Sequence, residues 1–166
     1  MAACYPTAAR ARDMLSYDPA TGHLLWRPGF GAHRTGKRAG CRSKARGHRY
    51  VRIDDVLCLE HRVAWLIVHG ALPGGEIDHI NGDKDDNRIE NLRIVDHQTN
   101  MQNIRRALVT NKLGLLGVQQ RCDGKKWCAR IIANGTTHHL GSFDTPELAH
   151  AAYLAAKRRL HDGCTI

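Results

Sequence analysis

Four polar residues are spaced so that they can meet around one hydrolytic centre: Asp78, His79, Asn91 and Asn100. A helix packed across a hairpin can set Asn100 opposite Asp78, and two oxygen ligands suit a hard divalent cation such as magnesium. His79 beside that cation can accept a proton from an attacking water. Asn91 can bond the far imidazole nitrogen of His79 and thereby fix its tautomer.

The elements around these residues are predicted from local patterns. A strand over 76–79 leads into a polar loop over 81–87, and the chain returns through a second strand over 92–95. Asp96 can cap a helix whose apolar residues fall at helical spacing: Met101, Ile104 and Leu108. In the plainer alternative, the same stretch is only a strand entering a turn, with Asn87 and Asn91 as loop formers.

The joint spacing resembles that of the HNH endonuclease family, whose fold is the ββα-metal finger. The matching residues are Asp78-His79, Asn91 in Glu90-Asn91-Leu92, and Asn100 in Gln98-Thr99-Asn100. The resemblance extends outward through His61-Arg62-Val63-Ala64 to about Tyr17. It implies that His79 is the general base, that Asp78 and Asn100 hold the metal, and that Asn91 orients His79. The last position is asparagine rather than histidine, as in the phage and intron-type homing enzymes, so tight zinc binding is not expected.

Composition favours a polyanionic partner. The 166 residues include 25 Lys and Arg against 16 Asp and Glu, a formal net charge of +9. This length suits one domain or two small ones. No apolar run is long enough to span a membrane, and residues 1–6 lack a signal-peptide core, so we expect the protein in the cytoplasm or nucleoid of a bacterial host.

The six cysteines form no C-x-x-C pair and are expected to be reduced: Cys4, Cys41, Cys58, Cys122, Cys128 and Cys164. A zinc staple that combines Cys41 and Cys58 with His48 or His61 is the alternative, but its spacing is not a recognised one. The expected cofactor is therefore Mg²⁺ or Mn²⁺, without a structural zinc ion.

A basic, glycine-rich arm over 27–49 is predicted to follow DNA phosphates. Its like charges are too dense for compact packing unless an anion neutralises them. The alternative is a solvated loop. The residues expected to contact DNA from the arm are Arg34, Lys37, Arg38, Arg42, Lys44 and Arg46.

Around the arm, local patterns predict the remaining elements of this half: a helix over 8–15, a turn over 17–22, a strand over 24–26, a hairpin over 50–59 and an apolar helix over 61–69. Gly70 and Pro73 end the last helix. His61 and Arg62 begin it close to the predicted site, where either can touch phosphate. A structural role for His61 is the alternative.

After a boundary over 105–112 the pattern changes. Asp123-Gly124 and Asn134-Gly135 are hairpin signals that separate strands over 116–121, 127–133 and 136–143. Thr145 then caps a helix whose apolar face is predicted to consist of Leu148, Ala152, Ala155 and Ala156. We expect the sheet to face this helix with Trp127, Ala129 and Ile131. The opposite face of the sheet is expected to carry polar and basic side chains.

This second pattern resembles the Apetala-two/ethylene-response-factor DNA-binding domain from Gly114 to about Gly163. The matching stretches are Gly117-Val118, Gln120-Arg121, Lys126-Trp127-Cys128-Ala129, Leu140-Gly141-Ser142-Phe143-Asp144-Thr145 and Ala149 through Ala156. That family reads DNA with the exposed face of its sheet, which implies DNA contacts from Gln119, Arg121, Arg130, Thr137 and His139. Gln119 replaces a family arginine, and Asp123 and His139 replace tryptophans, so the plant base preference is not transferred.

Together these patterns predict an α+β chain with two modules. Residues 1–106 form a nuclease module that includes the arm and a ββα-metal finger over 76–106, residues 107–113 a linker, and residues 114–166 a three-stranded antiparallel sheet plus one helix. The predicted function is a monomeric, metal-dependent endonuclease of phage or mobile-element type that nicks double-stranded DNA. The alternative is a non-catalytic DNA-binding protein with a degenerate finger. An RNA-binding role is disfavoured because few aromatic residues are available for stacking.

Overall fold

The chain forms two compact units, residues 1–96 and 97–166, and each is treated by itself. A computed structural model describes residues 5–30, 33–44, 47–105, 107, 111–161 and 164–165. Helices and small antiparallel sheets alternate in it, which confirms the predicted α+β class. Among the described residues, no helix combines the length and apolarity needed to cross a bilayer.

The described residues of the first unit form two α-helices, four strand pairings and one 3₁₀ turn. Its elements are α1 (Ala8–Met14), β1 (Leu15–Asp18), β2 (His23–Trp26), β3 (Cys41–Arg42), β4 (Arg49–Ile53), β5 (Val56–Leu59), α2 (Glu60–His69), β6 (Glu76–His79), η1 (Ile89–Asn91) and β7 (Leu92–Val95). β1 pairs with β2, β3 and β5 flank β4, and β6 pairs with β7. The predicted turn over 17–22 is shorter in the structure, because Tyr17 and Asp18 already belong to β1.

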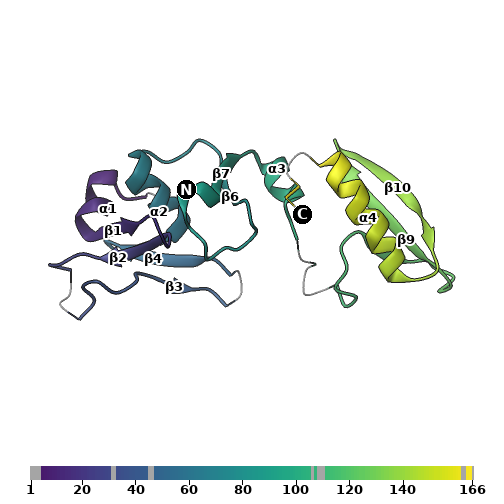
Figure 1. Ribbon diagram of the computed structural model, residues 1–166, viewed down its shortest axis with the longest axis horizontal. Coiled ribbons are helices and arrows are strands. Elements are labelled where there is room, and N and C mark those ends of the chain that lie inside the picture. Colours follow the sequence, from purple (N-terminus) through teal and green to yellow (C-terminus); the bar gives the residue numbers. More distant parts are fainter. Residues whose placement is uncertain are drawn as a thin grey trace. The chain divides into compact units, whose positions relative to one another are not determined.

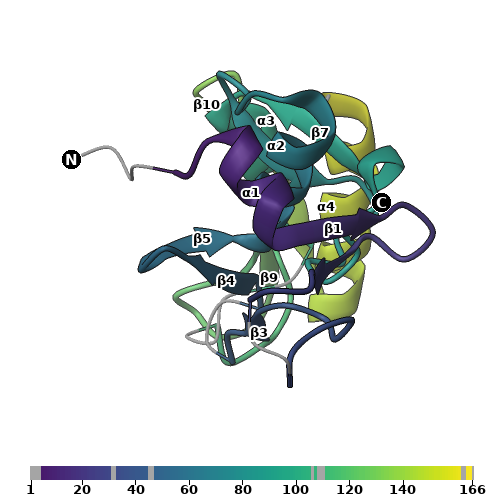
Figure 2. The ribbon, with the colours of Figure 1, turned by 90° about the vertical axis from the view of Figure 1, so that its left-hand side faces the viewer.

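Helix α2 supplies much of the core of this unit. Its apolar face is buried, and Gly70 ends it in the left-handed conformation at φ 80°. α1 and α2 lie side by side above β1 and β5 (Figure 2). Val51, Ile53 and Cys58, from the predicted hairpin, are completely or almost completely buried beneath them. Asp54 and Asp55 make the hairpin turn with positive φ, at 44° and 66°.

Several described residues of the basic arm are held by backbone hydrogen bonds to the strands beside it. Trp26 donates its backbone N–H to the Lys37 carbonyl, Ala39 donates to the Leu24 carbonyl, and Ala39 is fully buried. Further along, β3 pairs with β4. Carboxylates of the same unit supply the negative charge that allows this packing, because the guanidinium of Arg38 pairs with them, as described below.

The second unit contains α3 (His97–Gln102), β8 (Val118–Gln120), β9 (Trp127–Ala133), β10 (Thr136–Phe143) and α4 (Pro146–Leu160). The three strands form an antiparallel sheet in the order β10-β9-β8, as the hairpin signals predict. α4 lies along this sheet (Figure 1). The side chain of Thr145 caps α4 by accepting from the Leu148 N–H, and Pro146 is the first helical residue.

Helix α4 buries a different face from the predicted one. Leu148 is 54% exposed and Ala155 is also exposed, whereas Ala149, Ala156 and Lys157 are buried. The reason is a close approach between the helix and the start of β8. The ring of Tyr153 lies against Gly117, and this contact sets the rotation of the helix.

Helix α3 is shorter than predicted and ends at Gln102, where Asn103 donates to the Asn100 carbonyl in a turn. Ile104, a predicted apolar helix position, lies beyond the helix and is 39% exposed. Leu108 lies outside the described residues. The division into compact units falls after Asp96, before the predicted boundary at residues 107–113, and the domain division proposed from the sequence stays a prediction.

The Gly117–Tyr153 contact can be tested against a glycine with the same backbone conformation. Gly117 and Gly124 have φ of 71° and 69°, but a Cβ on Gly117 would lie 1.9 Å from Tyr153 Cδ2, whereas one on Gly124 meets nothing within 4 Å. Gly124→Ala should therefore cost about 1 kcal/mol through backbone strain alone. Gly117→Ala should add an overpacking cost of about 1–3 kcal/mol. Chemical denaturation of both variants measures the difference, and equal costs would contradict the close packing.

Candidate active site

The β6–β7 hairpin places the predicted metal ligand Asp78 and the predicted general base His79 at the loop end of strand β6. Asp78 lies opposite Arg93 and His79 opposite Leu92 in the antiparallel register. Asp78 is 7% exposed and His79 is 3% exposed. Neighbouring side chains of a strand point to opposite sides of it. Asp78 and His79 are nevertheless both buried, because both sides of the strand are covered at this end.

Asp78 forms an ion pair that the sequence interpretation missed. Its Oδ2 accepts from Nε of Arg93 at 3.0 Å and from the second guanidinium nitrogen at 2.8 Å. A buried carboxylate needs a positive partner, and Arg93 is that partner here. The sequence did not predict this pairing, because the long connection between β6 and β7 leaves the register of the two strands open.

Asn91 closes the loop between the two strands. Its side-chain oxygen accepts from the Asn81 backbone N–H at 2.9 Å, and its amide nitrogen donates to the Asp86 carbonyl at 2.8 Å. Its own carbonyl accepts from the Ile80 N–H. The side chain of Asn91 thus binds loop backbone rather than the imidazole of His79. Its predicted role of orienting His79 stays a prediction.

The hydrogen bond described for the His79 ring runs to a different asparagine. Nε2 of His79 lies 3.0 Å from the Oδ1 of Asn87, which is 1% exposed. With an amide oxygen as acceptor, Nε2 carries the proton and Nδ1 keeps its lone pair. Sequence reasoning treated Asn87 as a loop former, and no local pattern distinguishes it from other asparagines of this loop.

Contacts from the N-terminal hairpin hold Asn87 in place. The hydroxyl of Tyr17 accepts from the Ile89 N–H at 3.0 Å and donates to the Asn87 carbonyl at 3.4 Å. Gly22 lies so close to the loop that a Cβ would be 2.3 Å from the Arg88 backbone nitrogen. Tyr17, near the start of the chain, therefore helps to position Asn87, whose side chain contacts His79.

A buried ionic group connects the same loop to the start of α2. Glu60 is fully buried, and its Oε2 lies 2.8 Å from Nε of Arg49. Arg38 lies 3.6 Å from the other Glu60 oxygen and 2.9 Å from Asp85 of the loop. Burial raises the pKa of Glu60, and the two arginines oppose that rise. Arg38 is thus engaged by the protein itself, and its predicted DNA contact stays a prediction.

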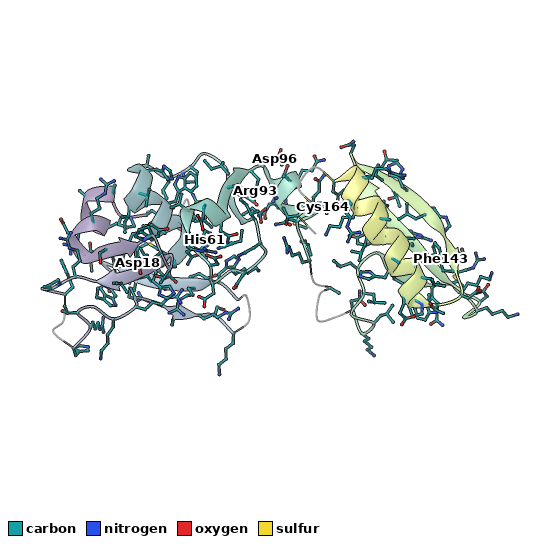
Figure 3. The ribbon with its side chains drawn as sticks, viewed as in Figure 1. Asp18, His61, Arg93, Asp96, Phe143 and Cys164 are labelled. Atoms are coloured by element: carbon teal, nitrogen blue, oxygen red, sulfur yellow. The ribbon has the colours of Figure 1, made fainter. Side chains whose placement is uncertain are left out.

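Three imidazoles meet beside this group. His48 precedes β4, His61 lies in the first turn of α2 (labelled in Figure 3), and His79 ends β6. Their ring centroids are 5.1–5.9 Å apart, and the possible ligand nitrogens all lie within 4.8 Å of one another. Burial lowers the pKa of His61 to about 2, with the neighbouring His79 and His48 adding to the effect. Burial also lowers the pKa of His79, against the Asn87 bond and Asp78. Both rings are therefore neutral near pH 7.

Of the other predicted site residues of the nuclease module, Asn100 belongs to the second unit and Arg46 has no described position. Asn100 is half-buried on α3 of the second unit, and its pairing with Asp78 stays a prediction. Arg46 lies outside the described residues. The exposed arm residues are Arg34, Lys37, Arg42 and Lys44.

The predicted DNA-reading residues of the second unit share one face of its sheet. His139 pairs with Arg130 and Thr137 with Ile132, so their side chains point away from α4. Arg121 reaches this face at Ser142, with 3.4 Å between its guanidinium and the hydroxyl. All five predicted residues are exposed. A depression of about 420 Å³ is lined by residues that include Gln119, Arg121, Arg130 and His139.

Comparison with known proteins finds a family that is similar to part of the chain. Residues 58–102, from the end of β5 through α3, match the family model of the HNH endonuclease. This part of the chain is thus similar to the HNH endonuclease domain. His48 and the arm precede the matched residues, and the three-stranded sheet follows them.

A relative of the chain comes from a bacteriophage. Protein 3.8 of Escherichia phage T7 is 29% identical over 102 residues, which cover 61% of this chain and 83% of that protein. No solved structure matches the chain.

The lowered pKa of His61 and His79 predicts acid sensitivity of the first unit. Below pH 6.5 the unfolded chain takes up more protons at these two rings than the folded chain does, so stability falls as pH falls. Each such group contributes up to about 1.4 kcal/mol per pH unit. Urea unfolding between pH 7 and pH 5 should show this loss, and His61→Gln should reduce the slope. A pH-independent free energy of unfolding in that range would contradict the neutral histidine cluster.

Proposed function

We propose that the protein is a metal-dependent DNA endonuclease that nicks one strand of a duplex, with His79 as the general base. The observation that supports this most strongly is the His79–Asn87 hydrogen bond inside the residues that match the HNH endonuclease. It leaves a neutral imidazole with a lone pair on Nδ1, next to a buried carboxylate. General-base catalysis needs such a nitrogen in its unprotonated form at the working pH.

In the proposed reaction His79 takes a proton from a water that attacks the scissile phosphate. The bond from phosphorus to the 3′ oxygen then breaks and leaves a 5′ phosphate and a 3′ hydroxyl, as the family resemblance implies. Asn87 acts as a positioning residue, because it fixes the tautomer and the ring plane. Asn91 acts one step further away by closing the loop that carries Asn87.

Asp78 is the oxygen ligand that fits a Mg²⁺ or Mn²⁺ ion, with Asn100 as its proposed second ligand. The carboxylate is buried and already requires a positive charge beside it, which Arg93 provides. When bound, the cation stabilises the negative charge that develops on the departing 3′ oxygen. With Asp78 engaged in this way, the half-buried guanidinium of Arg93 can turn to a DNA phosphate.

The second unit is proposed to locate the site on DNA. The exposed side chains of Arg130, His139 and Gln119 lie on the sheet face opposite α4, where a strand can enter the major groove. This assignment follows the resemblance to the plant DNA-binding domain. The exposed arm residues would add phosphate contacts, which raise affinity without reading sequence.

Removing the proposed base tests the reaction directly. His79→Ala should lower the rate of supercoiled-plasmid nicking by about 10²–10⁴-fold, because proton transfer from water is lost. His69→Ala removes an exposed histidine of the same unit and should leave the rate unchanged. Open circles should accumulate before linear DNA if one copy cuts one strand. A parental rate in His79→Ala would eliminate the base assignment, and the absence of metal-dependent nicking by the unchanged chain would favour a non-catalytic DNA-binding protein.

Replacing Asn87 distinguishes positioning from mere packing. Asn87→Asp keeps an acceptor for Nε2 but adds a negative charge, which raises the pKa of His79. The acid limb of the kcat/KM profile should therefore move to higher pH than in the parent. Asn87→Ala should lower kcat at every pH and leave KM nearly unchanged. An unmoved acid limb in Asn87→Asp, with the variant folded, would separate Asn87 from the proton transfer.

The sheet face can be tested with two matched arginines of the second unit. Arg130 lies on the proposed DNA face, whereas Arg159 is exposed on α4. Arg130→Ala should weaken DNA binding measured by fluorescence anisotropy, and should reduce the slope of log affinity against log salt by about 0.9 if a phosphate contact is lost. Arg159→Ala removes the same charge and should have a much smaller effect. Equal effects would indicate that only net charge matters.

A further inference from the structure

The histidine cluster contains a residue that the proposed reaction does not use. His48 lies before β4, outside the matched HNH residues, yet its ring centroid is 5.2 Å from His61 and 5.9 Å from His79. His61 is 4% exposed and contacts His79 edge-on at 5.1 Å. Three separate segments of the first unit thus deliver imidazoles to one point.

Nitrogen donors select a different class of metal from the oxygen donor at Asp78. Imidazole suits Zn²⁺ and neighbouring transition metals, whereas carboxylates suit Mg²⁺ and Mn²⁺. Three imidazoles with an open fourth position are a recognised zinc ligand set. Tetrahedral ligation needs nitrogens about 3.4 Å apart at ordinary zinc–nitrogen distances. The present separations, all within 4.8 Å, can reach that value through small side-chain movements, chiefly of half-buried His48.

The surroundings of the cluster also favour a bound cation at the His79 side. Nε2 of His79 lies 3.0 Å from Oδ1 of Asn87, an outer hydrogen bond of the kind that orients a ligating imidazole and leaves the other ring nitrogen unprotonated. Asp78 and Asp83 lie near enough to stabilise positive charge on the His79 ring. Arg62 and Lys84 oppose positive charge at His61, so we expect moderate rather than tight affinity.

We infer that His48, His61 and His79 form a binding site for a borderline transition-metal ion such as Zn²⁺, and that its occupancy inhibits cleavage. Binding the metal through Nδ1 uses the lone pair that would otherwise accept the proton from water. The inhibitory part rests on the proposed function, whereas the binding part does not. The site differs from the oxygen site at Asp78 in donors and in preferred metal.

Cobalt binding to the reduced, metal-free chain of residues 1–166 tests the ligands directly. Co²⁺ as the probe should produce the visible absorption of a tetrahedral nitrogen site, without the near-ultraviolet band of cobalt–thiolate bonds, and Zn²⁺ should displace it. His48→Ala should weaken this binding about tenfold or more. His61→Asn provides a second ligand deletion, and His69→Ala is the control with an exposed histidine. Thermal unfolding without metal verifies that each variant is folded.

Cleavage supplies the second measurement. Zn²⁺ added to Mg²⁺-supported nicking should inhibit the parent chain, and His48→Ala should need about tenfold more Zn²⁺ for the same fractional inhibition of its own zinc-free rate. Unchanged cobalt affinity in both folded ligand variants, or a thiolate band, would overturn the site. Cobalt binding with no Mg²⁺-dependent nicking would instead overturn the proposed function and, with it, the inhibitory role. Nicking without cobalt binding would overturn this inference alone.

Discussion

The hydrogen bond between His79 Nε2 and Asn87 Oδ1 is the constraint on which the rest of the site depends. It decides which nitrogen of the imidazole has a lone pair, and it fixes the ring at the end of β6. Asn87 can make this bond only because Tyr17 holds the loop backbone on either side of it, and because Gly22 lets the N-terminal hairpin approach. The first hairpin of the chain thus serves the chemistry of a residue more than fifty positions later.

Buried charge gives the loop a second attachment. Glu60 lies at the start of α2 beside His61, and Arg49 and Arg38 connect it to Asp85 of the loop. A buried carboxylate of this kind is costly unless it is paired, so the two arginines hold α2, the arm and the loop in one arrangement. The same requirement explains Arg93 beside Asp78. In both places an arginine neutralises a carboxylate of the protein, and one of these arginines, Arg38, was predicted from the sequence to contact DNA.

Local patterns predicted the hairpins, α2, the sheet of the second unit and the β6–loop–β7 framework, because turn residues and apolar spacing are local properties. They could not predict which asparagine of the loop reaches His79. That depends on the path of the loop, which Asn91 and Tyr17 set from opposite ends. Nor could they predict His48, because its place beside the site depends on the packing of the arm. The helix predicted after Asp96 ends early. None of the residues of α3 is buried, so no apolar packing stabilises a longer helix there.

The tautomer of His79 tests this account most directly. Nitrogen-15 NMR of the histidine rings at pH 7, assigned by comparison with His79→Gln, reports which ring nitrogen carries the proton. The account predicts a neutral His79 with the proton on Nε2 and a bare Nδ1, and a loss of this preference in Asn87→Ala. A proton on Nδ1, or a charged ring at pH 7, would contradict it.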